Sequence, residues 1–138
     1  MTRVSLDSVM IEMARIMAQR ATCKKMSVGC ILTDVSGRIL SAGYNGVAAG
    51  RIHCIDTPCV GACEATHAES NAIISCYAPR SEIYACYTIW SPCLHCCKQL
   101  IQTGCMEIVF GERSDEYEAA HKFWTGMEFS RRIMKKHY

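Results

Sequence analysis

Apolar positions near the start of the chain recur at helical spacing and then give way to two short apolar runs. A helix capped by Ser5 is predicted from the methionine-rich stripe Leu6, Val9, Met10, Met13, Ile16 and Met17, because recurrence every three to four residues is typical of an amphipathic helix. We expect this stripe to pack in the core. Runs 28–33 and 38–42 predict strands, and the polar segment 34–37 between them predicts a hairpin turn.

The rest of the chain alternates between further helical and extended patterns. Segment 43–66 is rich in Gly and Cys without clear periodicity, and loops of this length are usually functional or stapled. Beyond it we predict a helix over 67–77, a strand over 82–88, a helix over 92–103 with Gly104 as its C-cap, a strand over 106–110, and then a further helix and a final amphipathic segment. This order predicts an α/β fold in a single domain, residues 1–138, with helices packed on a mixed sheet.

Charge and apolar content narrow the classes of protein that fit. The net charge is only +2, from 15 basic and 13 acidic residues, which argues against a nucleic-acid polymer as partner. The sequence has no run of about 20 apolar residues, so no membrane span is predicted. Residues 1–7 lack a signal-peptide pattern. We therefore expect a cytoplasmic protein without a membrane partner, located in the host cytosol if the source is viral.

Eleven cysteines are many for a chain of 138 residues. Their number is odd, several are closely spaced, and no export signal precedes them, so metal binding in a reducing compartment is favoured over a disulfide framework.

The chemistry of the chain is indicated by His67-Ala68-Glu69 and, further on, by Pro92-Cys93-Leu94-His95-Cys96. One imidazole and two thiolates can hold Zn²⁺ and leave a fourth position for water. The metal would lower the pKa of that water, and Glu69, a carboxylate that is not a ligand, could carry protons. This spacing is typical of zinc-dependent deaminases and predicts hydrolytic removal of an amine from a base.

Each pair of residues in this constellation falls at the start of a predicted helix. Cys93 and Cys96 are three residues apart and share a helix face, so both thiols can reach one metal. Cys97 is the alternative ligand at i,i+4, and His95 is expected to point elsewhere. Ordinary core cysteines with a surface histidine are the competing interpretation; a lone Cys-x-x-Cys would also fit a redox motif.

The chain resembles the cytidine/deoxycytidylate deaminase superfamily, and within it the deoxycytidylate (dCMP) deaminases, including phage-type members. The resemblance covers about residues 5–111 and is carried by four stretches: 28–32, 43–46, 67–73 and 87–98. It implies a cytidine-deaminase-like fold with a central sheet of about five strands. It also implies hydrolysis of dCMP to dUMP and ammonia, which supplies dUMP for thymidylate synthesis in pyrimidine metabolism.

The resemblance further implies roles for residues around the base. Glu69 would carry protons from the water to N3 and then to the leaving amine, and the Ala68 N–H would hold the base carbonyl. Asn45 would contact the sugar or shape the nucleotide sites, and Trp90 could stack on a base. The 5′-phosphate needs a cationic or N–H-rich cradle, for which the candidates are Lys24, Lys25, Ser27 and Tyr117; a solvated helix end is the competing interpretation of the two lysines.

Many dCMP deaminases of this kind are hexamers activated by dCTP and inhibited by dTTP, and the Gly-Tyr-Asn-Gly motif belongs to their effector site. The expected allosteric residues are therefore Gly43, Tyr44, Asn45 and Gly46, and Mg²⁺ would accompany the triphosphate. Arg51 would substitute for the basic residue that family members often carry in the helix after His67. A glycine-rich turn after a strand is the competing interpretation.

A second metal is expected in the cysteine-rich loop, because similar enzymes from phages and bacteria staple this loop with a structural zinc. Our assignment is a closed site of four thiolates from Cys23, Cys54, Cys59 and Cys63, with His53 as a replacement for one of them. The competing interpretation is incidental small cysteines. Four others, Cys30, Cys76, Cys86 and Cys105, lie in apolar contexts and are predicted to be core residues.

Several other functions fit parts of the pattern. A cytosine deaminase acting on single-stranded nucleic acid shares Trp90-Ser91-Pro92-Cys93, but the near-neutral charge and the context of residues 43–46 and 69–73 disfavour it. A tRNA adenosine deaminase would need a basic tail, and free-nucleoside deaminases usually carry Cys where His67 stands. A zinc-stapled binding module without activity would not need Glu69.

Overall fold

A five-stranded mixed sheet lies at the centre of the computed structural model, which describes residues 2–23, 26–53, 65–126 and 131–138. The strands are β1 (Gly29–Thr33), β2 (Ile39–Tyr44), β3 (Ala85–Trp90), β4 (Glu107–Glu112) and β5 (Ile133–Lys136). The helices are α1 (Leu6–Ala18), α2 (Ala68–Ile74), α3 (Leu94–Leu100) and α4 (Tyr117–Thr125), with a short 3₁₀ turn at Arg80–Glu82.

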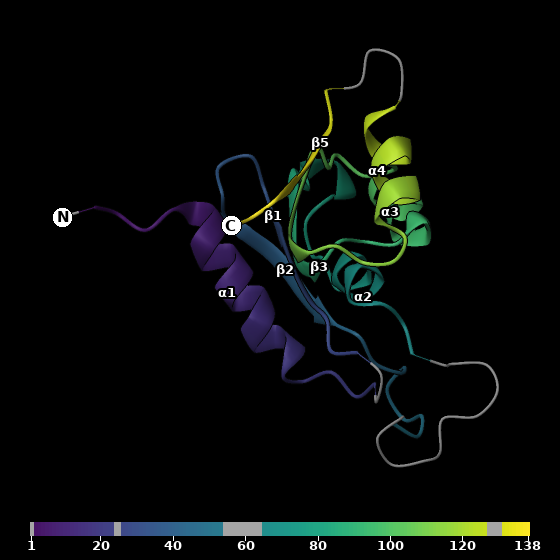
Figure 1. The fold of residues 1–138 in the computed structure, drawn as a ribbon. Helices are drawn as coiled ribbons and strands as arrows, with labels where there is room; N and C mark the ends of the chain where they lie inside the picture. Colours follow the sequence, from purple (N-terminus) through teal and green to yellow (C-terminus); the bar gives the residue numbers. More distant parts are fainter. Residues whose placement is uncertain (1, 24–25, 54–64, 127–130) are drawn as a thin grey trace.

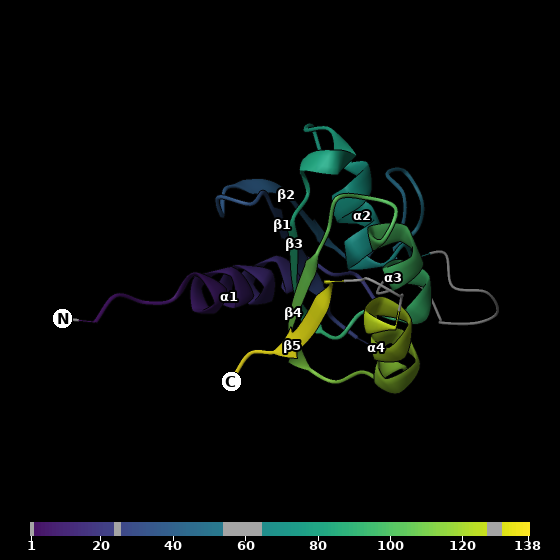
Figure 2. The same cartoon turned by 90° about the horizontal axis from the view of Figure 1, so that it is seen from above.

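The order of strands in the sheet is β2-β1-β3-β4-β5. β1 pairs antiparallel with both β2 and β3, whereas β3, β4 and β5 run parallel. Helix α1 covers one face of the sheet, and α2, α3 and α4 cover the other (Figures 1 and 2). The α/β class, the mixed sheet and its five strands confirm the fold expected from the sequence.

The first helix and the hairpin form as the sequence predicts. The Ser5 side chain accepts a hydrogen bond from the Ser8 N–H and so caps α1. In the turn, the Asp34 carboxylate accepts from the N–H groups of Ser36 and Arg38 at 2.9 Å each, and Gly37 has a φ of +83° that other residues adopt rarely.

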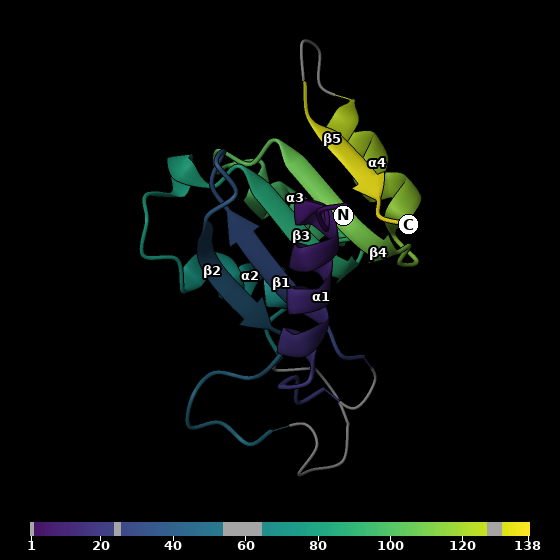
Figure 3. The same cartoon turned by 90° about the vertical axis from the view of Figure 1, so that its left-hand side faces the viewer.

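Both faces of the sheet are packed with apolar side chains. On the α1 face, Met10, Ile11 and Ala14 pack against Ile31 of β1 and Tyr87 of β3. Figure 3 shows α1 lying across this face of the sheet. The stripe of α1 is only partly core, since Leu6, Val9 and Ile16 are 47%, 41% and 61% exposed. On the opposite face, the cysteines predicted to be core residues are all buried: Cys30, Cys76, Cys86 and Cys105.

Several predicted boundaries are wrong. The second helix starts at Ala68 with His67 as its N-cap and ends at Ile74 instead of residue 77. Residues 80–82, partly assigned to a strand, form the 3₁₀ turn, and that strand continues to Trp90. The third helix ends at Leu100 with Ile101 as its C-cap, so the prediction of Gly104 as C-cap is wrong. Gly104 instead packs closely on the backbone of Ser81 and Ile83, where a side chain would clash.

The C-terminal strand is tied to the first helix. The Lys135 ammonium lies 3.2 Å from the Asp7 carboxylate of α1 and 3.0 Å from the Glu107 carboxylate of β4. The chain's final strand is therefore anchored across the edge of the α1 face. Within the described residues, no helix has the length and apolar character needed to cross a membrane.

Candidate active site

Three side chains from the starts of two helices converge at one edge of the sheet. His67 is the N-cap of α2, Cys93 is the N-cap of α3, and Cys96 lies in the first turn of α3. Their ligand atoms all lie within 4.8 Å of one another, the only such group of His, Cys and acidic side chains among the described residues. The pairing of Cys93 with Cys96 arises because both lie on one face of the first turn.

The distances within this cluster fit tetrahedral zinc. The Nδ1 atom of His67 lies 3.5 Å from the Cys93 Sγ and 3.4 Å from the Cys96 Sγ. Tetrahedral Zn²⁺ with ordinary Zn–S and Zn–N bond lengths holds such atoms about 3.6 Å apart. Cys97 is buried and its Sγ points to the Pro92 carbonyl at 4.0 Å, so this alternative residue is outside the cluster.

The electrostatics of the cluster favour an anionic thiolate beside a cation. The hydrogen bond from Cys96 lowers the pKa of Cys93 to about 3, and His67 contributes in the same direction. The same thiol pairing raises the pKa of Cys96. The hydrogen bond with Cys93 raises the pKa of His67. This donor set of one imidazole and two thiols is the kind that binds a soft divalent metal.

Glu69 lies beside the cluster, in the first turn of α2, with only 4% of its surface exposed. Burial raises the pKa of its carboxyl group above the ordinary value. The Thr88 hydroxyl of β3 donates a hydrogen bond to Glu69 Oε1 at 3.2 Å. A carboxyl group whose pKa moves towards neutrality is suited to taking up and releasing protons.

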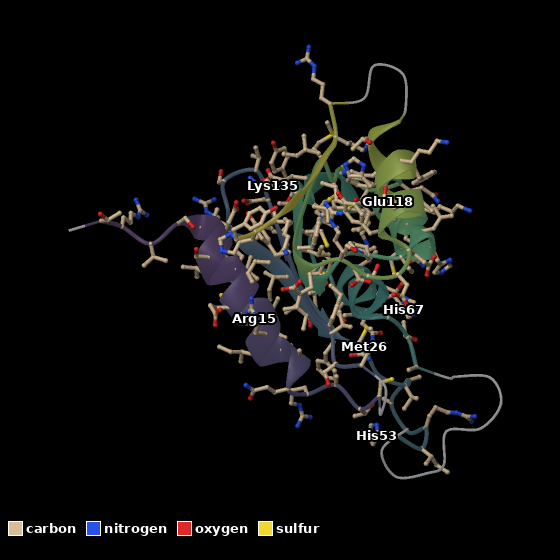
Figure 4. All side chains as sticks on the ribbon, in the orientation of Figure 1. Arg15, Met26, His53, His67, Glu118 and Lys135 are labelled. Atoms are coloured by element: carbon tan, nitrogen blue, oxygen red, sulfur yellow. The ribbon has the colours of Figure 1, made fainter. Side chains whose placement is uncertain are left out.

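A cavity of about 390 Å³ opens in front of the cluster. Its walls include the predicted substrate residues Asn45, Ala68 and Trp90, together with His67, Glu69 and Cys93. His67 and Met26, which both line the cavity, are labelled in Figure 4. A volume of this size and a mixture of apolar walls with a few polar groups suit a small molecule.

Loops that follow neighbouring parallel strands supply residues that sequence reasoning missed. Ser91 follows β3 and Ser114 follows β4; the Ser91 hydroxyl donates to the Ser114 hydroxyl at 3.0 Å and accepts from its N–H at 2.8 Å. This places Asp115 and Glu116 at the cavity. The remaining wall residues not predicted are Met26, Val28, Ala65, Ser91, Pro92 and Ser114. These residues could have been found from the rule that parallel strands present their carboxyl ends, and the loops that follow them, at the same edge of a sheet.

Other predicted substrate residues lie elsewhere or outside the described chain. Ser27 and Tyr117 do not line the cavity. The Tyr117 ring packs against Phe110, with centroids 5.4 Å apart, and lies under the Arg113 guanidinium. Lys24 and Lys25 are outside the described residues, although Cys23 and Met26, which flank them in the sequence, line the cavity.

Of the residues predicted for an effector site, Gly43 and Tyr44 end β2, and Asn45 and Gly46 form the turn that follows it. The Asn45 side chain accepts from the Val28 N–H at 2.8 Å and donates to the Met26 carbonyl at 2.7 Å, so it holds the segment before β1. Gly46 exchanges two backbone hydrogen bonds with Thr66, the residue before His67. This turn is therefore physically connected to the start of α2.

Three further residues of that prediction have separate surroundings. Tyr44 lies at the end of β2, with the Arg20 guanidinium 6.0 Å from its ring centroid. Gly43 packs against the α2 backbone, where an added Cβ would lie 2.6 Å from the Ala72 nitrogen. Arg51 is exposed and its N–H donates to the Ala48 carbonyl.

The residues predicted to hold a structural zinc are largely beyond what can be described. Cys54, Cys59 and Cys63 lie outside the described residues. Cys23 is partly buried and lines the cavity. His53, predicted as a replacement for one of the four thiolates, is exposed and labelled in Figure 4.

The sequence matches one protein family over most of its length. Residues 4–112 match the family described as "Cytidine and deoxycytidylate deaminase zinc-binding region". The chain belongs to this family, whose zinc-binding description agrees with the His67, Cys93 and Cys96 cluster.

The chain is similar in sequence to known proteins from a bacterium and a yeast. ComE operon protein 2 of Bacillus subtilis (strain 168) is 34% identical over 118 residues, which are 81% of this chain and 62% of that protein. The deoxycytidylate deaminase of Schizosaccharomyces pombe is 33% identical over 123 residues, covering 78% of this chain and 37% of that protein. The chain thus spans less than two thirds of the length of these relatives.

Similarity also extends to a phage protein and a solved structure. The deoxycytidylate deaminase of Mycobacterium phage D29 is 28% identical over 131 residues, covering 83% of this chain and all of that protein. The dCMP deaminase from cyanophage S-TIM5, solved in complex with dCMP and dUMP, has a TM-score of 0.78 at 21% identity, covering 99% and 100% of the two chains. The structural likeness establishes a shared fold.

Proposed function

We propose that this chain is a zinc-dependent enzyme that hydrolyses dCMP to dUMP and ammonia. The observation that carries the proposal is the convergence of His67, Cys93 and Cys96 at zinc-binding distances, with buried Glu69 beside them in one cavity. A binding module would not need a buried carboxylate at this place. The names of the relatives support a deoxycytidylate substrate, and dUMP so formed would supply thymidylate synthesis.

The metal would be held by His67 Nδ1 and the sulfurs of Cys93 and Cys96. Bound in this way, zinc supplies a Lewis acid that lowers the pKa of water and leaves a fourth position open. Cys93 is well suited to this role because its hydrogen bonds with Cys96 and His67 lower its pKa, which favours the thiolate form.

Proton movement is assigned to Glu69. Its carboxylate takes one proton from the attacking water and delivers it to N3 of the cytosine ring. It then takes the remaining proton from the oxygen that has bonded to C4 and delivers it to the amine, so that the C4=O bond forms as ammonia leaves. Burial, which raises its pKa, makes the carboxylate a stronger base and so favours the uptake of a proton from the water. The Ala68 N–H belongs to the first turn of α2, where backbone donors have no partner within the helix, and it is proposed to hold the base carbonyl. Trp90 and Asn45 would contact base and sugar.

The 5′-phosphate of dCMP needs cationic or N–H groups to bind it. Among the described wall residues there is no Lys or Arg, and Asp115 and Glu116 carry negative charge. The phosphate is therefore proposed to lie on the side of Cys23 and Met26, and Lys25 and Ser27 are kept as candidates because they adjoin these two residues in the sequence. Tyr117 is a further candidate for binding the phosphate.

Regulation and assembly extend the proposal. The effectors would be dCTP as activator and dTTP as inhibitor, with Mg²⁺, at Gly43, Tyr44, Asn45, Gly46 and Arg51. The hydrogen bonds between Gly46 and Thr66 support a route from this turn to His67. The enzyme is further proposed to be a hexamer in the cytoplasm. A second zinc is proposed to be held by Cys23, Cys54, Cys59 and Cys63.

The experiment that tests the reaction follows loss of cytosine absorbance with zinc-loaded protein. Substrates would be dCMP, deoxycytidine, dCTP and a cytosine-containing single-stranded oligonucleotide, and the matched control is Glu69→Gln. Turnover of dCMP alone, abolished in Glu69→Gln with zinc still bound, is the expected result. Turnover of the oligonucleotide alone would replace this function with nucleic-acid editing, and activity retained by Glu69→Gln would remove the proton-carrying role.

A further inference from the structure

Thr88 occupies the part of the sheet that lies beneath the candidate active site. It belongs to β3, where alternate side chains face opposite sides: Tyr87 packs towards α1, and Cys86 packs towards α2 and α3. Thr88 therefore shares the face of Cys86. Its exposed fraction is zero, and its backbone is paired on both sides, with Cys30 of β1 and Phe110 of β4. A side chain in this place has little freedom to move.

The Thr88 hydroxyl has one described partner, the Glu69 carboxylate, at 3.2 Å from Oε1. An ionised carboxylate only accepts hydrogen bonds, so the threonine donates its single proton. β-branching restricts the threonine side chain further, which fixes the direction of that donor. The bond engages Oε1 of the carboxylate, which also has a side-chain hydrogen bond with Cys96 of the proposed metal site.

Packing alone does not explain a hydroxyl at this position. Valine has nearly the same shape and is favoured in buried strands, whereas a buried hydroxyl is unfavourable unless it is hydrogen-bonded. The presence of threonine here is accounted for by the contact with Glu69.

We propose that Thr88 is a positioning residue that holds the Glu69 carboxylate at the orientation needed for proton transfer. This inference rests on the proposed deaminase function and adds a residue to its machinery. A proton carrier must lie within hydrogen-bonding reach of the group that it serves, and small misplacement lowers the rate. Thr88 acts through Glu69 and has no assigned contact with the base.

The test compares Thr88→Val and Thr88→Ala, which lack the hydroxyl, with Thr88→Ser, which keeps it. Thr33→Val is the matched control, because Thr33 is a buried threonine of β1 that does not line the cavity. For each zinc-loaded protein we would measure kcat and KM for dCMP, zinc content and thermal unfolding. The Glu69 carboxylate would be located in crystal structures of the valine and serine variants.

Thr88→Val and Thr88→Ala are expected to lower kcat by about 10- to 100-fold, with KM and zinc content close to wild type and the carboxylate rotated away. Thr88→Ser and Thr33→Val should keep kcat near wild type, and the serine variant should keep the carboxylate in place.

Wild-type kcat in both hydroxyl-free variants would overturn the inference, as would a serine variant as slow as the valine variant. Wild-type protein that holds zinc but deaminates no cytosine substrate would instead refute the proposed function, and with it the inference. The two failures are thus distinguishable by the behaviour of the wild type.

Discussion

Replacing Gly43 by alanine should move the helix that carries two of the proposed site residues. Gly43 lies in β2 directly against α2, and an added Cβ would sit 2.5 Å from the Ala68 carbonyl oxygen and 2.6 Å from the Ala72 nitrogen. Both neighbours are backbone atoms, so neither can rotate away. Reaching ordinary contact at about 3.4 Å requires α2 to shift by roughly 0.9 Å.

The shift has a cost in stability and in rate. Overpacking of this kind destabilises a protein by about 1–3 kcal/mol, which corresponds to a fall of roughly 4–12 °C in Tm for a chain of this size. His67 and Glu69 lie at the start of α2. Displacement of catalytic groups by about 1 Å can lower the rate by up to about 100-fold.

The assay is denaturant unfolding at fixed zinc concentration, followed by tryptophan fluorescence, together with kcat for dCMP. Gly46→Ala is the matched control from the same motif, since the nearest atom to its Cβ would be the Thr22 Oγ1 at 3.2 Å, the end of a side chain, with the Tyr44 ring at ordinary contact distance. It should lie within about 1 kcal/mol of wild type. A Gly43→Ala protein with wild-type stability and turnover, altered only in its response to dCTP, would refute the packing argument and favour the effector role.

Further predictions concern the metal and the C-terminal strand. Cys96→Ala should lose zinc whereas Cys97→Ala should retain it, as measured by elemental analysis; equal zinc content in both would contradict the ligand assignment. Removing zinc with a chelator should lower Tm, and adding zinc back should restore it, because binding stabilises only the folded chain. Fully loaded protein should contain two zinc ions per chain, and a single ion would exclude the second site. Trp124→Phe should cost about 1–3 kcal/mol in unfolding free energy without lowering kcat, because it removes the donor 2.9 Å from the Ile133 carbonyl; an unchanged free energy would show that this bond is not important.

Features that depend on near neighbours in the chain could be predicted. The first helix with its Ser5 cap, the hairpin around Gly37, and the pairing of Cys93 with Cys96 each follow from spacings of two to four residues. Such spacings determine which side chains share a turn or a face, whatever the rest of the chain does. The ends of α2 and α3 were harder to predict, because apolar character continues beyond the last helical turn.

Other features required the arrangement of distant segments. The insertion of β3 between β1 and β4, parallel to β4, brings Ser114, Asp115 and Glu116 to the cavity beside Ser91. No local spacing relates these residues to His67, and their polar character alone is equally typical of a surface loop.

The proposed zinc ligands and the proposed proton carrier could thus be named from the chain itself, since the chemistry needs those residue types at short spacings. The role of Thr88 and the packing of Gly43 were not, because a threonine in an apolar run and a glycine after a strand have many uses. Their contacts with Glu69 and the α2 backbone arise only when β2, β3 and α2 come together. Strand register and helix position, which depend on the whole core, decide those contacts.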